Sequence, residues 1–146
     1  MTRCAVLALL LALSLAAPAA AGERLTGRAH VTDGDTISVG GVAVRLKGVA
    51  APEIAHFGDP GEPGGTEAKA FMMELVEGQI VICDLTHERT HGRRVGWCYR
   101  DGHDIAAALM RAGLARDCPR FSGGRYAAVE RPAAAGLPFP SYCVPR

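Results

Sequence analysis

The chain has 146 residues, a formal net charge of +1, 49% apolar residues and 21% charged residues. That length suits a single domain, and the apolar content excludes an intrinsically disordered chain. The near-zero net charge excludes a polybasic protein that coats nucleic acid through its overall charge, but it leaves open an enzyme that gathers a few cations at one site.

The first 21 residues have the layout of a secretory signal peptide. Arg3 supplies a positive charge, the 13 residues from Ala5 to Ala17 are almost all apolar, and residues 19–21 offer an A-x-A cleavage site. A run of that length is too short to span the roughly 30 Å of a bilayer's hydrocarbon core, which argues against a membrane anchor. We therefore expect cleavage after residue 21 and a secreted or periplasmic mature chain without a stable membrane anchor.

Alternating apolar residues predict five short strands in the mature chain. A bend at Asp33-Gly34 separates the first two strands, and a hairpin turn at Gly40-Gly41 separates the second from the third. The polar stretch Thr86–Arg93 lies between the last two. The predicted strands are Leu25–Val31, Thr36–Val39, Val42–Val49, Ile80–Leu85 and Arg94–Arg100.

Helix signals lie between and after these strands. A surface loop rich in Gly and Pro, Ile54–Gly65, precedes a predicted helix over Glu67–Val76 with Thr66 as its N-cap. A second helix is predicted over Ile105–Ala112, where Asp104 can cap the first turn through its carboxylate.

The C-terminal part is less regular. Tyr126–Arg131 predicts a short third helix that Pro132 should end, which leaves residues 132–146 as an irregular tail. Five strands with one helix after the third and another after the fifth suit a mainly β fold. We expect a five-stranded barrel of OB type with two to three helices.

After cleavage, four cysteines remain: Cys83, Cys98, Cys118 and Cys143. An even number of cysteines in an exported chain favours disulfides. If the fourth and fifth strands form a hairpin, Cys83 and Cys98 lie about equally far from its centre and face each other, which leaves Cys118 for Cys143 and tethers the tail. The alternative is a zinc site built from Cys83, His87, His91 and Cys98, although no C-x2-C knuckle is present.

Three short segments carry residue types suited to phosphate chemistry. Asp33 and Asp35 lie two residues apart at the start of a strand, where two carboxylates can face one cleft and hold Ca²⁺ or Mg²⁺. Arg45 interrupts an apolar strand eight residues before Glu53, and residues 91–94 form a basic segment able to bind phosphate. Taken singly, each segment is a weak signal that is better explained by a turn, a solvated side chain or a basic loop.

Taken in order, four motifs resemble the staphylococcal nuclease family. They are VTDGDTI at residues 31–37, VRLKGVAAPE at 44–53, HGRRVGWCY at 91–99 and GLA at 113–115. Four motifs in sequence are far more specific than one. The resemblance covers roughly residues 25–130 and implies a nuclease domain over 22–131 with a five-strand OB-type barrel and three helices. It also implies hydrolysis of phosphodiester bonds in DNA or RNA that depends on Ca²⁺, or on another divalent metal.

By position, the resemblance assigns roles to five residues. Asp35 matches the family's metal-ligand aspartate, and Asp33 matches a supporting acid nearby. Arg45 and Arg93 match the two arginines that hold the phosphate and stabilise it during the reaction. Glu53 matches the carboxylate proposed to activate water.

The chain departs from the family pattern in three places. Ala50 stands where the family has a metal-ligand Asp, so affinity for Ca²⁺ should fall, because the number of charged ligands helps to set it. His91 replaces a common Tyr, and Phe121 only partly matches an aromatic pair, which implies weaker or different nucleotide contacts. His91 and Arg94, on either side of Arg93, are still expected to bind substrate.

These observations lead to two hypotheses about function. The first is an exported, metal-dependent nuclease that acts as a monomer on nucleic acid. The second is a catalytically weak OB-type binding module of the cell envelope, for example one associated with exopolysaccharide. Ala50 divides the two hypotheses, and the retained set of Asp35, Arg45, Glu53 and Arg93 favours the nuclease.

Overall fold

The computed structural model describes residues 22–146, so the expected signal peptide lies outside the described residues. Within that range, no helix is both long enough and apolar enough to cross a membrane.

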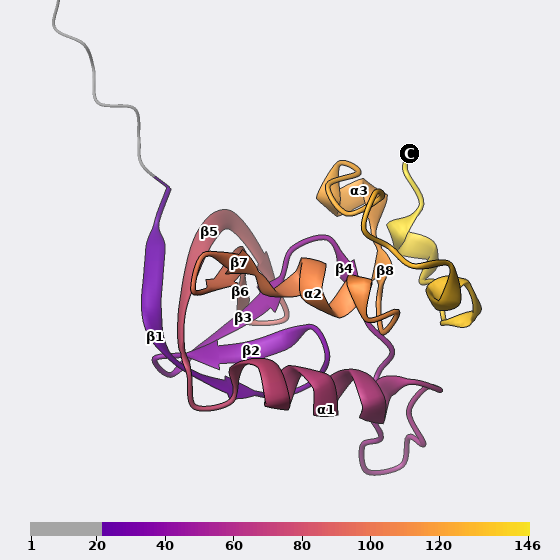
Figure 1. Ribbon diagram of the computed structural model, residues 1–146, viewed down its shortest axis with the longest axis horizontal. Helices are drawn as coiled ribbons and strands as arrows, with labels where there is room; N and C mark the ends of the chain where they lie inside the picture. The colour runs from indigo at the N-terminus through magenta and orange to yellow at the C-terminus, as the bar shows by residue number, and fades with distance from the viewer. Residues whose placement is uncertain (1–21) are drawn as a thin grey trace, which may run out of the picture.

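The main sheet closes on itself. Its five ring strands are β1 (Arg24–Val31), β2 (Thr36–Val39), β3 (Val42–Leu46), β5 (Ile80–Thr90) and β6 (Arg93–Arg100). They pair in the order β3-β2-β1-β5-β6, and a parallel pairing between β3 and β6 joins the two ends of this series (Figure 1). The short strand β7 (His103–Asp104) pairs antiparallel with the end of β6. The expected mainly β fold with an OB-like ring of five strands is confirmed.

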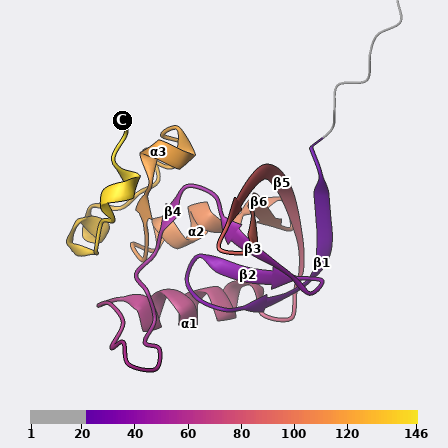
Figure 2. The same ribbon diagram turned by 180° about the vertical axis from the view of Figure 1, so that it is seen from behind.

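The core lies inside the ring and extends to two helices. Along the strands, alternate residues face inward, as the two-residue period requires. They include Ile37 and Val39 of β2 and Val44 of β3, all fully buried. Helix α1 (Gly65–Val76) runs along one side of the sheet, and α2 (Ile105–Arg111) adds a second apolar face (Figures 1 and 2). This shared core fixes the positions of β2 and β3.

The predicted third strand is broken. We expected Val42–Val49 to be continuous, but β3 ends at Leu46 and a separate strand β4 (Val49–Ala50) pairs with β8 (Arg116–Asp117). Gly48 makes the break, since its φ of 76° is a left-handed conformation that favours glycine. A side chain there would also meet the Ser122 Cβ at 2.5 Å.

The last two predicted strands are longer than expected. β5 continues to Thr90 and β6 begins at Arg93, so most of the polar stretch Thr86–Arg93 is strand. The hairpin turns at His91-Gly92, where both residues have positive φ. This extension could not be predicted from the sequence, because its polar side chains face outward from the barrel and give no apolar alternation.

The first two helices lie close to their predicted positions. α1 begins at Gly65 with Gly64 as its N-cap, so the prediction that Thr66 caps it is wrong. In α2, the Asp104 carboxylate accepts a hydrogen bond from the Ala107 N–H at 3.1 Å, which confirms the predicted cap.

The predicted third helix is wrong. In the segment Tyr126–Arg131 the first four residues form a turn and the last two are irregular, and the third helix is instead α3 (Pro119–Ser122), with proline at the first helical position. The tail is more ordered than expected, because Pro132 starts the 3₁₀ helix η1 (Pro132–Gly136) instead of ending a helix. A second 3₁₀ turn, η2 (Ser141–Cys143), follows.

Both predicted disulfides are present. Cys83 and Cys98 are directly paired across β5 and β6 and are joined by one bond, and Cys118 is joined to Cys143 by the other. The zinc alternative is therefore wrong, since two of its four ligands are bonded to each other. The second disulfide ties the tail to the segment between β8 and α3.

We predict that the paired change Cys83→Ala and Cys98→Ala lowers the free energy of unfolding. This cross-link closes a 15-residue loop, and restricting the unfolded chain by such a loop contributes about 3 kcal/mol. Urea denaturation of the oxidised protein measures the change. Identical unfolding midpoints for variant and wild type would contradict it.

Candidate active site

A buried ion pair between Asp35 and Arg45 lies at the centre of the candidate active site. In the sheet register, Thr36 of β2 pairs with Arg45 of β3, which brings the two charged side chains together at the start of β2. Arg45 Nη1 donates to Asp35 Oδ1 at 3.0 Å, and Nη2 lies 2.7 Å from Oδ2. The side chain of Asp35 is 3% exposed and that of Arg45 is 16% exposed. Two contacts of this kind fix both the distance and the orientation of the guanidinium.

The charge state of Asp35 depends on its partner. Burial raises the pKa of Asp35 to about 7, the charge of Arg45 opposes that rise, and the neighbouring carboxylates of Asp33 and Glu53 add to it. Removal of Arg45 would leave a buried acid without a cation. The pair is therefore a structural unit as well as a candidate phosphate site.

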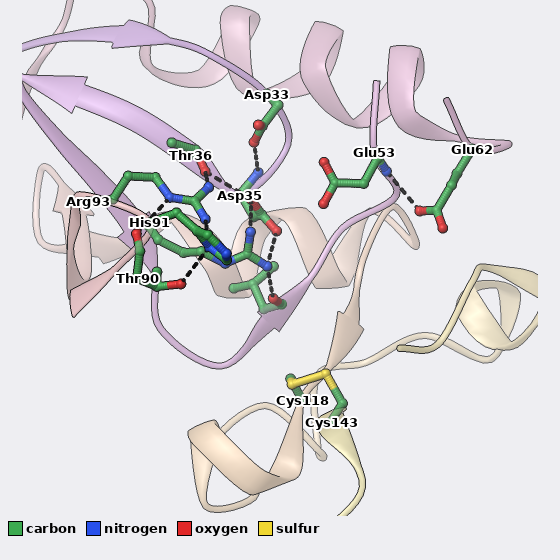
Figure 3. A network of polar contacts seen from close by, with 12 residues as sticks. Asp33, Asp35, Thr36, Glu53, Glu62, Thr90, His91, Arg93, Cys118 and Cys143 are labelled. Carbon is green, nitrogen blue, oxygen red and sulfur yellow. Dashed lines mark hydrogen bonds and ion pairs between the residues drawn. A yellow bond between two sulfur atoms is a disulfide. The ribbon is translucent and has the colours of Figure 1, made fainter. Parts of the chain in front are cut away.

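Thr36 links this pair to Arg93. Its hydroxyl donates to Asp35 Oδ1 at 3.0 Å and accepts from Arg93 Nη1 at 3.1 Å. Arg93 also donates through Nε to the Thr90 carbonyl at 3.2 Å, and its Nη2 lies 3.4 Å from His91 Nδ1. Figure 3 shows Arg93 beside Thr36 and His91, next to the Asp35 side chain. The structure thus brings together Asp35, Arg45, His91 and Arg93, as the sequence predicts.

Two other expected residues have different contacts. Asp33 Oδ1 accepts a hydrogen bond from the Asp35 backbone N–H at 3.0 Å and so stabilises the bend that precedes β2. Arg94 donates to the two carboxylate oxygens of Glu23 at 3.0 and 2.6 Å, and it is absent from the lining of the pocket described below.

Glu53 is held at the pocket through its backbone. Its N–H donates to Glu62 Oε2 at 2.9 Å, while its carbonyl accepts from the Glu62 N–H at 2.9 Å. Gly65 permits the close approach of this loop, because a Cβ there would lie 2.2 Å from the Glu53 carbonyl oxygen. The carboxylate is exposed and points toward Asp35 (Figure 3).

A pocket of about 520 Å³ is lined by Arg45 of this ion pair. Its charged and histidine lining residues are Arg45, Lys47, Arg89, Arg93, His91, Glu53 and Glu88. Lys47 and Glu88 form an ion pair with each other and Arg45 pairs with Asp35, which leaves Arg89, Arg93 and Glu53 to set the local charge. A cleft with this excess of cations attracts anions even though the net charge of the chain is close to zero.

Ala50 is buried behind the pocket wall and does not line it, although Val49 and Cys118 do. It is 1% exposed and belongs to a small apolar cluster with the disulfide-bonded Cys118 and Cys143. The position where the family pattern places a carboxylate is therefore held by a buried apolar side chain in a cluster with this disulfide.

The carboxylates present suit a cation site that water and substrate complete better than one formed by protein ligands alone. Among residues 22–146, no three His, Cys, Asp or Glu side chains converge as a metal site. Asp35 Oδ2 faces Arg45 at 2.7 Å but has no well-aligned hydrogen bond, and Glu53 supplies a carboxylate to the pocket that Arg45 lines. One or two carboxylates, completed by water and substrate phosphate, are a common way to hold a divalent cation.

Sequence reasoning missed two residues of this site. Thr36 is one, although its position directly after Asp35 on a strand was visible in the pattern. Tyr142 is the other, and it lines the same pocket as Arg45 and Glu53. The one sequence signal for Tyr142 is the expected Cys118–Cys143 disulfide, because this bond places the end of the chain near β8.

The family model described as staphylococcal nuclease homologue matches residues 43–131. The chain belongs to this family. The matched range contains Arg45, Glu53 and Arg93, whereas Asp33 and Asp35 precede it and Tyr142 follows it.

Relatives of this chain include a protein named for succinoglycan biosynthesis and proteins named as probable endonucleases. The succinoglycan biosynthesis protein ExoI of Rhizobium meliloti (strain 1021) is 34% identical over 132 residues, which are 86% of this chain and 69% of the relative. Probable endonuclease LCL3 of Schizophyllum commune is 38% identical over 80 residues, which are 54% of this chain and 27% of the relative. LCL3 of Debaryomyces hansenii is 37% identical over 75 residues, 49% of this chain and 32% of the relative. The matched region thus spans less than a third of each of these two endonuclease-named proteins.

We predict that Gly65→Ala destabilises this protein and displaces Glu53. The added methyl would meet backbone atoms of Glu53 and Ile54 at 2.2 to 3.1 Å, and such overpacking costs about 1–3 kcal/mol. That cost exceeds the helix-propensity gain of up to ~1 kcal/mol. Gly136→Ala is the matched control, because nothing lies within 4 Å of its added Cβ. Equal unfolding free energies for the two variants would contradict this view of Gly65.

We also predict that Ala50→Asp lowers the free energy of unfolding by about 2 kcal/mol in the presence of EDTA, because a carboxylate would be buried against the disulfide. Ala43→Asp, at an exposed position of β3, is the matched control and should have little effect. Urea denaturation measures both. An Ala50→Asp variant as stable as wild type would mean that the side chain at position 50 reaches solvent.

Proposed function

We propose that this protein is an exported, metal-dependent nuclease that hydrolyses phosphodiester bonds of DNA, RNA or both. The observation that carries the proposal is the convergence of Arg45, Arg93 and Glu53 on one cation-rich pocket. The family match and the endonuclease-named relatives support the same substrate class. We further propose that the mature chain acts as a monomer, with its nuclease domain over residues 22–131 and a tethered tail.

The two arginines bind the phosphate and stabilise its transition state. Attack on a phosphodiester increases negative charge on the phosphoryl oxygens, and preorganised cations facing those oxygens lower the barrier. Arg45 is held rigid by Asp35, and Arg93 is held by Thr36 and the Thr90 carbonyl. Neither guanidinium has to be reoriented when substrate arrives.

Glu53 orients the attacking water and accepts its proton as the oxygen–phosphorus bond forms. The bond to the leaving alkoxide breaks, and the alkoxide is protonated from solvent, so water and one phosphodiester give a phosphomonoester and an alcohol. The loop contacts to Glu62 and Gly65 hold the Glu53 backbone at the pocket edge.

Asp35, supported by Asp33, and Glu53 are the residues that would hold a divalent cation, with Ca²⁺ as our first candidate. When bound, such a cation would stabilise negative charge on the phosphoryl oxygens as a Lewis acid. Because Ala50 supplies no ligand, we expect weak binding of Ca²⁺ to the substrate-free protein, with a dissociation constant above ~10⁻⁴ M.

Export rests on two features of the chain. Residues 1–21 have the pattern of a signal peptide, and the two disulfides require an oxidising compartment to form and persist. Both are consistent with the periplasm or the medium as the site of action.

We predict that the oxidised mature protein cleaves single-stranded DNA or RNA in the presence of Ca²⁺ and that Arg93→Ala lowers kcat by about 10²- to 10³-fold. Arg93 is the sharper test of the two arginines, since Arg45→Ala would also strand the buried Asp35. Arg24→Ala is the control, because Arg24 pairs with Asp84 outside the pocket. Arg94→Ala should cost less activity than Arg93→Ala, because Glu23 holds the Arg94 guanidinium.

Each outcome of this experiment bears on the proposal. Absence of cleavage at every Ca²⁺, Mg²⁺ and Mn²⁺ concentration would overturn it. Normal cleavage by Arg93→Ala would overturn the role assigned to that residue. Chelation by EDTA should abolish cleavage, and activity that persists in EDTA would overturn the dependence on metal.

A catalytically weak binding module of the cell envelope is the second candidate function. Two observations favour it: the missing carboxylate at Ala50 and the similarity to a protein named for succinoglycan biosynthesis. It predicts that the protein binds an acidic exopolysaccharide in a calorimeter and cuts no nucleic acid. Cleavage without polysaccharide binding would exclude it.

A further inference from the structure

The end of the chain returns to the candidate active site. Residues 132–146 lie beyond the family match, yet Tyr142 lines the pocket together with Arg45 and Glu53. In both views of the ribbon, the last segment lies beside α3, at the end of the molecule away from β1 (Figures 1 and 2). A segment that the family pattern does not include thus supplies part of the pocket wall.

Several contacts fix the position of Tyr142. The neighbouring residue, Cys143, is fully buried and bonded to Cys118, and its N–H donates to the Pro140 carbonyl at 2.9 Å. The ring of Tyr142 lies 6.3 Å from that of Phe121, with an angle of 60° between the planes. Such a tilted arrangement is favourable for two aromatic rings. The disulfide shown in Figure 3 therefore anchors the 3₁₀ turn that carries the tyrosine.

The Tyr142 hydroxyl lies within the field of the ion pair. Burial raises the pKa of Tyr142, the cation of Arg45 lowers it, and the carboxylates of Asp35 and Glu53 raise it again. A hydroxyl beside Arg45 can donate a hydrogen bond to the oxygen of a phosphate that Arg45 binds. The ring beside it offers an apolar surface to the adjoining sugar or base.

Tyr142 forms a wall of the pocket and does not fill it. The residue is 47% exposed, and about 520 Å³ remains open next to it. A side chain that blocked the site would have to occupy this space.

We propose that Tyr142 is a substrate-contacting residue of the phosphate pocket, supplied by the C-terminal tail and held in place by the Cys118–Cys143 disulfide. The proposal rests on the nuclease function proposed above. It makes the tail a working part of the site and gives the second disulfide a role in substrate binding.

The test measures binding and cleavage separately. Binding of a fluorescein-labelled single-stranded oligonucleotide is followed by anisotropy in EDTA, where no metal-dependent cleavage occurs, and cleavage is followed with Ca²⁺. We expect Tyr142→Ala to weaken binding about tenfold through loss of the ring. Tyr142→Phe should weaken it about threefold, through loss of one hydrogen bond. Phe139→Ala is the matched control, because Phe139 is an exposed aromatic residue of the same tail that contacts Arg116 and does not line the pocket.

A double-mutant cycle tests the role of the disulfide. The paired change Cys118→Ala and Cys143→Ala should weaken binding as much as Tyr142→Ala does, and adding Tyr142→Ala to it should have little further effect. Thermal unfolding of each variant shows whether the barrel still folds. If the cysteine variant fails to fold, Tyr142→Ala and Tyr142→Phe alone decide the proposal.

The possible failures are distinguishable. A wild-type protein that neither binds nor cleaves the oligonucleotide contradicts the nuclease function and this proposal together. A wild-type protein that binds, with Tyr142→Ala indistinguishable from Phe139→Ala, contradicts this proposal alone. Tighter binding or faster cleavage by Tyr142→Ala would show that the tail obstructs the site, which also overturns it.

Discussion

The buried pair of Asp35 and Arg45 is the constraint on which the rest of the site depends. Moving two ions out of water costs several kcal/mol for each, and only close, well-oriented contact offsets that cost. The contact exists because Thr36 of β2 pairs with Arg45 of β3. A slip of one residue in this register would turn every side chain of one strand to the other face and separate the charges. The pairing of these two strands and the geometry of the site are therefore specified together.

The same dependence extends to the closure of the barrel. Arg93 begins β6, and β6 reaches β3 only through the parallel pairing that closes the ring. Once closed, the ring brings the Arg93 guanidinium to the Thr36 hydroxyl, which is already bonded to Asp35. A barrel that opened at this seam would keep the ion pair and lose the second arginine. Closure of the ring thus brings side chains that lie far apart in the sequence into contact at one site.

The strands, α2, both disulfides and the grouping of Asp35, Arg45, His91 and Arg93 could be predicted from the sequence, because each has a local signal. Inward-facing apolar residues mark the strands, and the ordered motifs mark the site. The extension of β5 to Thr90 had no such signal, since its side chains face outward. The break at Gly48 depends on Ser122, and the position of Tyr142 depends on a disulfide partner, so both are consequences of tertiary structure. The resemblance places Ala50 at the family's metal-ligand position, and the structure adds that this residue is buried in a cluster with Cys118 and Cys143.

The Cys118–Cys143 disulfide links the residue at position 50 to the position of the tail. The space beside Ala50 holds the Cys118–Cys143 disulfide, and a solvent-free contact with sulfur cannot also accommodate an ionised carboxylate without a large desolvation cost. The disulfide therefore favours a small apolar residue at position 50. The disulfide in turn holds Tyr142 at the pocket that Arg45 lines. Relative to the family pattern, the site has exchanged a negative charge for an aromatic hydroxyl. If the proposed roles hold, that exchange would weaken binding of a free cation and leave phosphate binding to the arginines and the tyrosine.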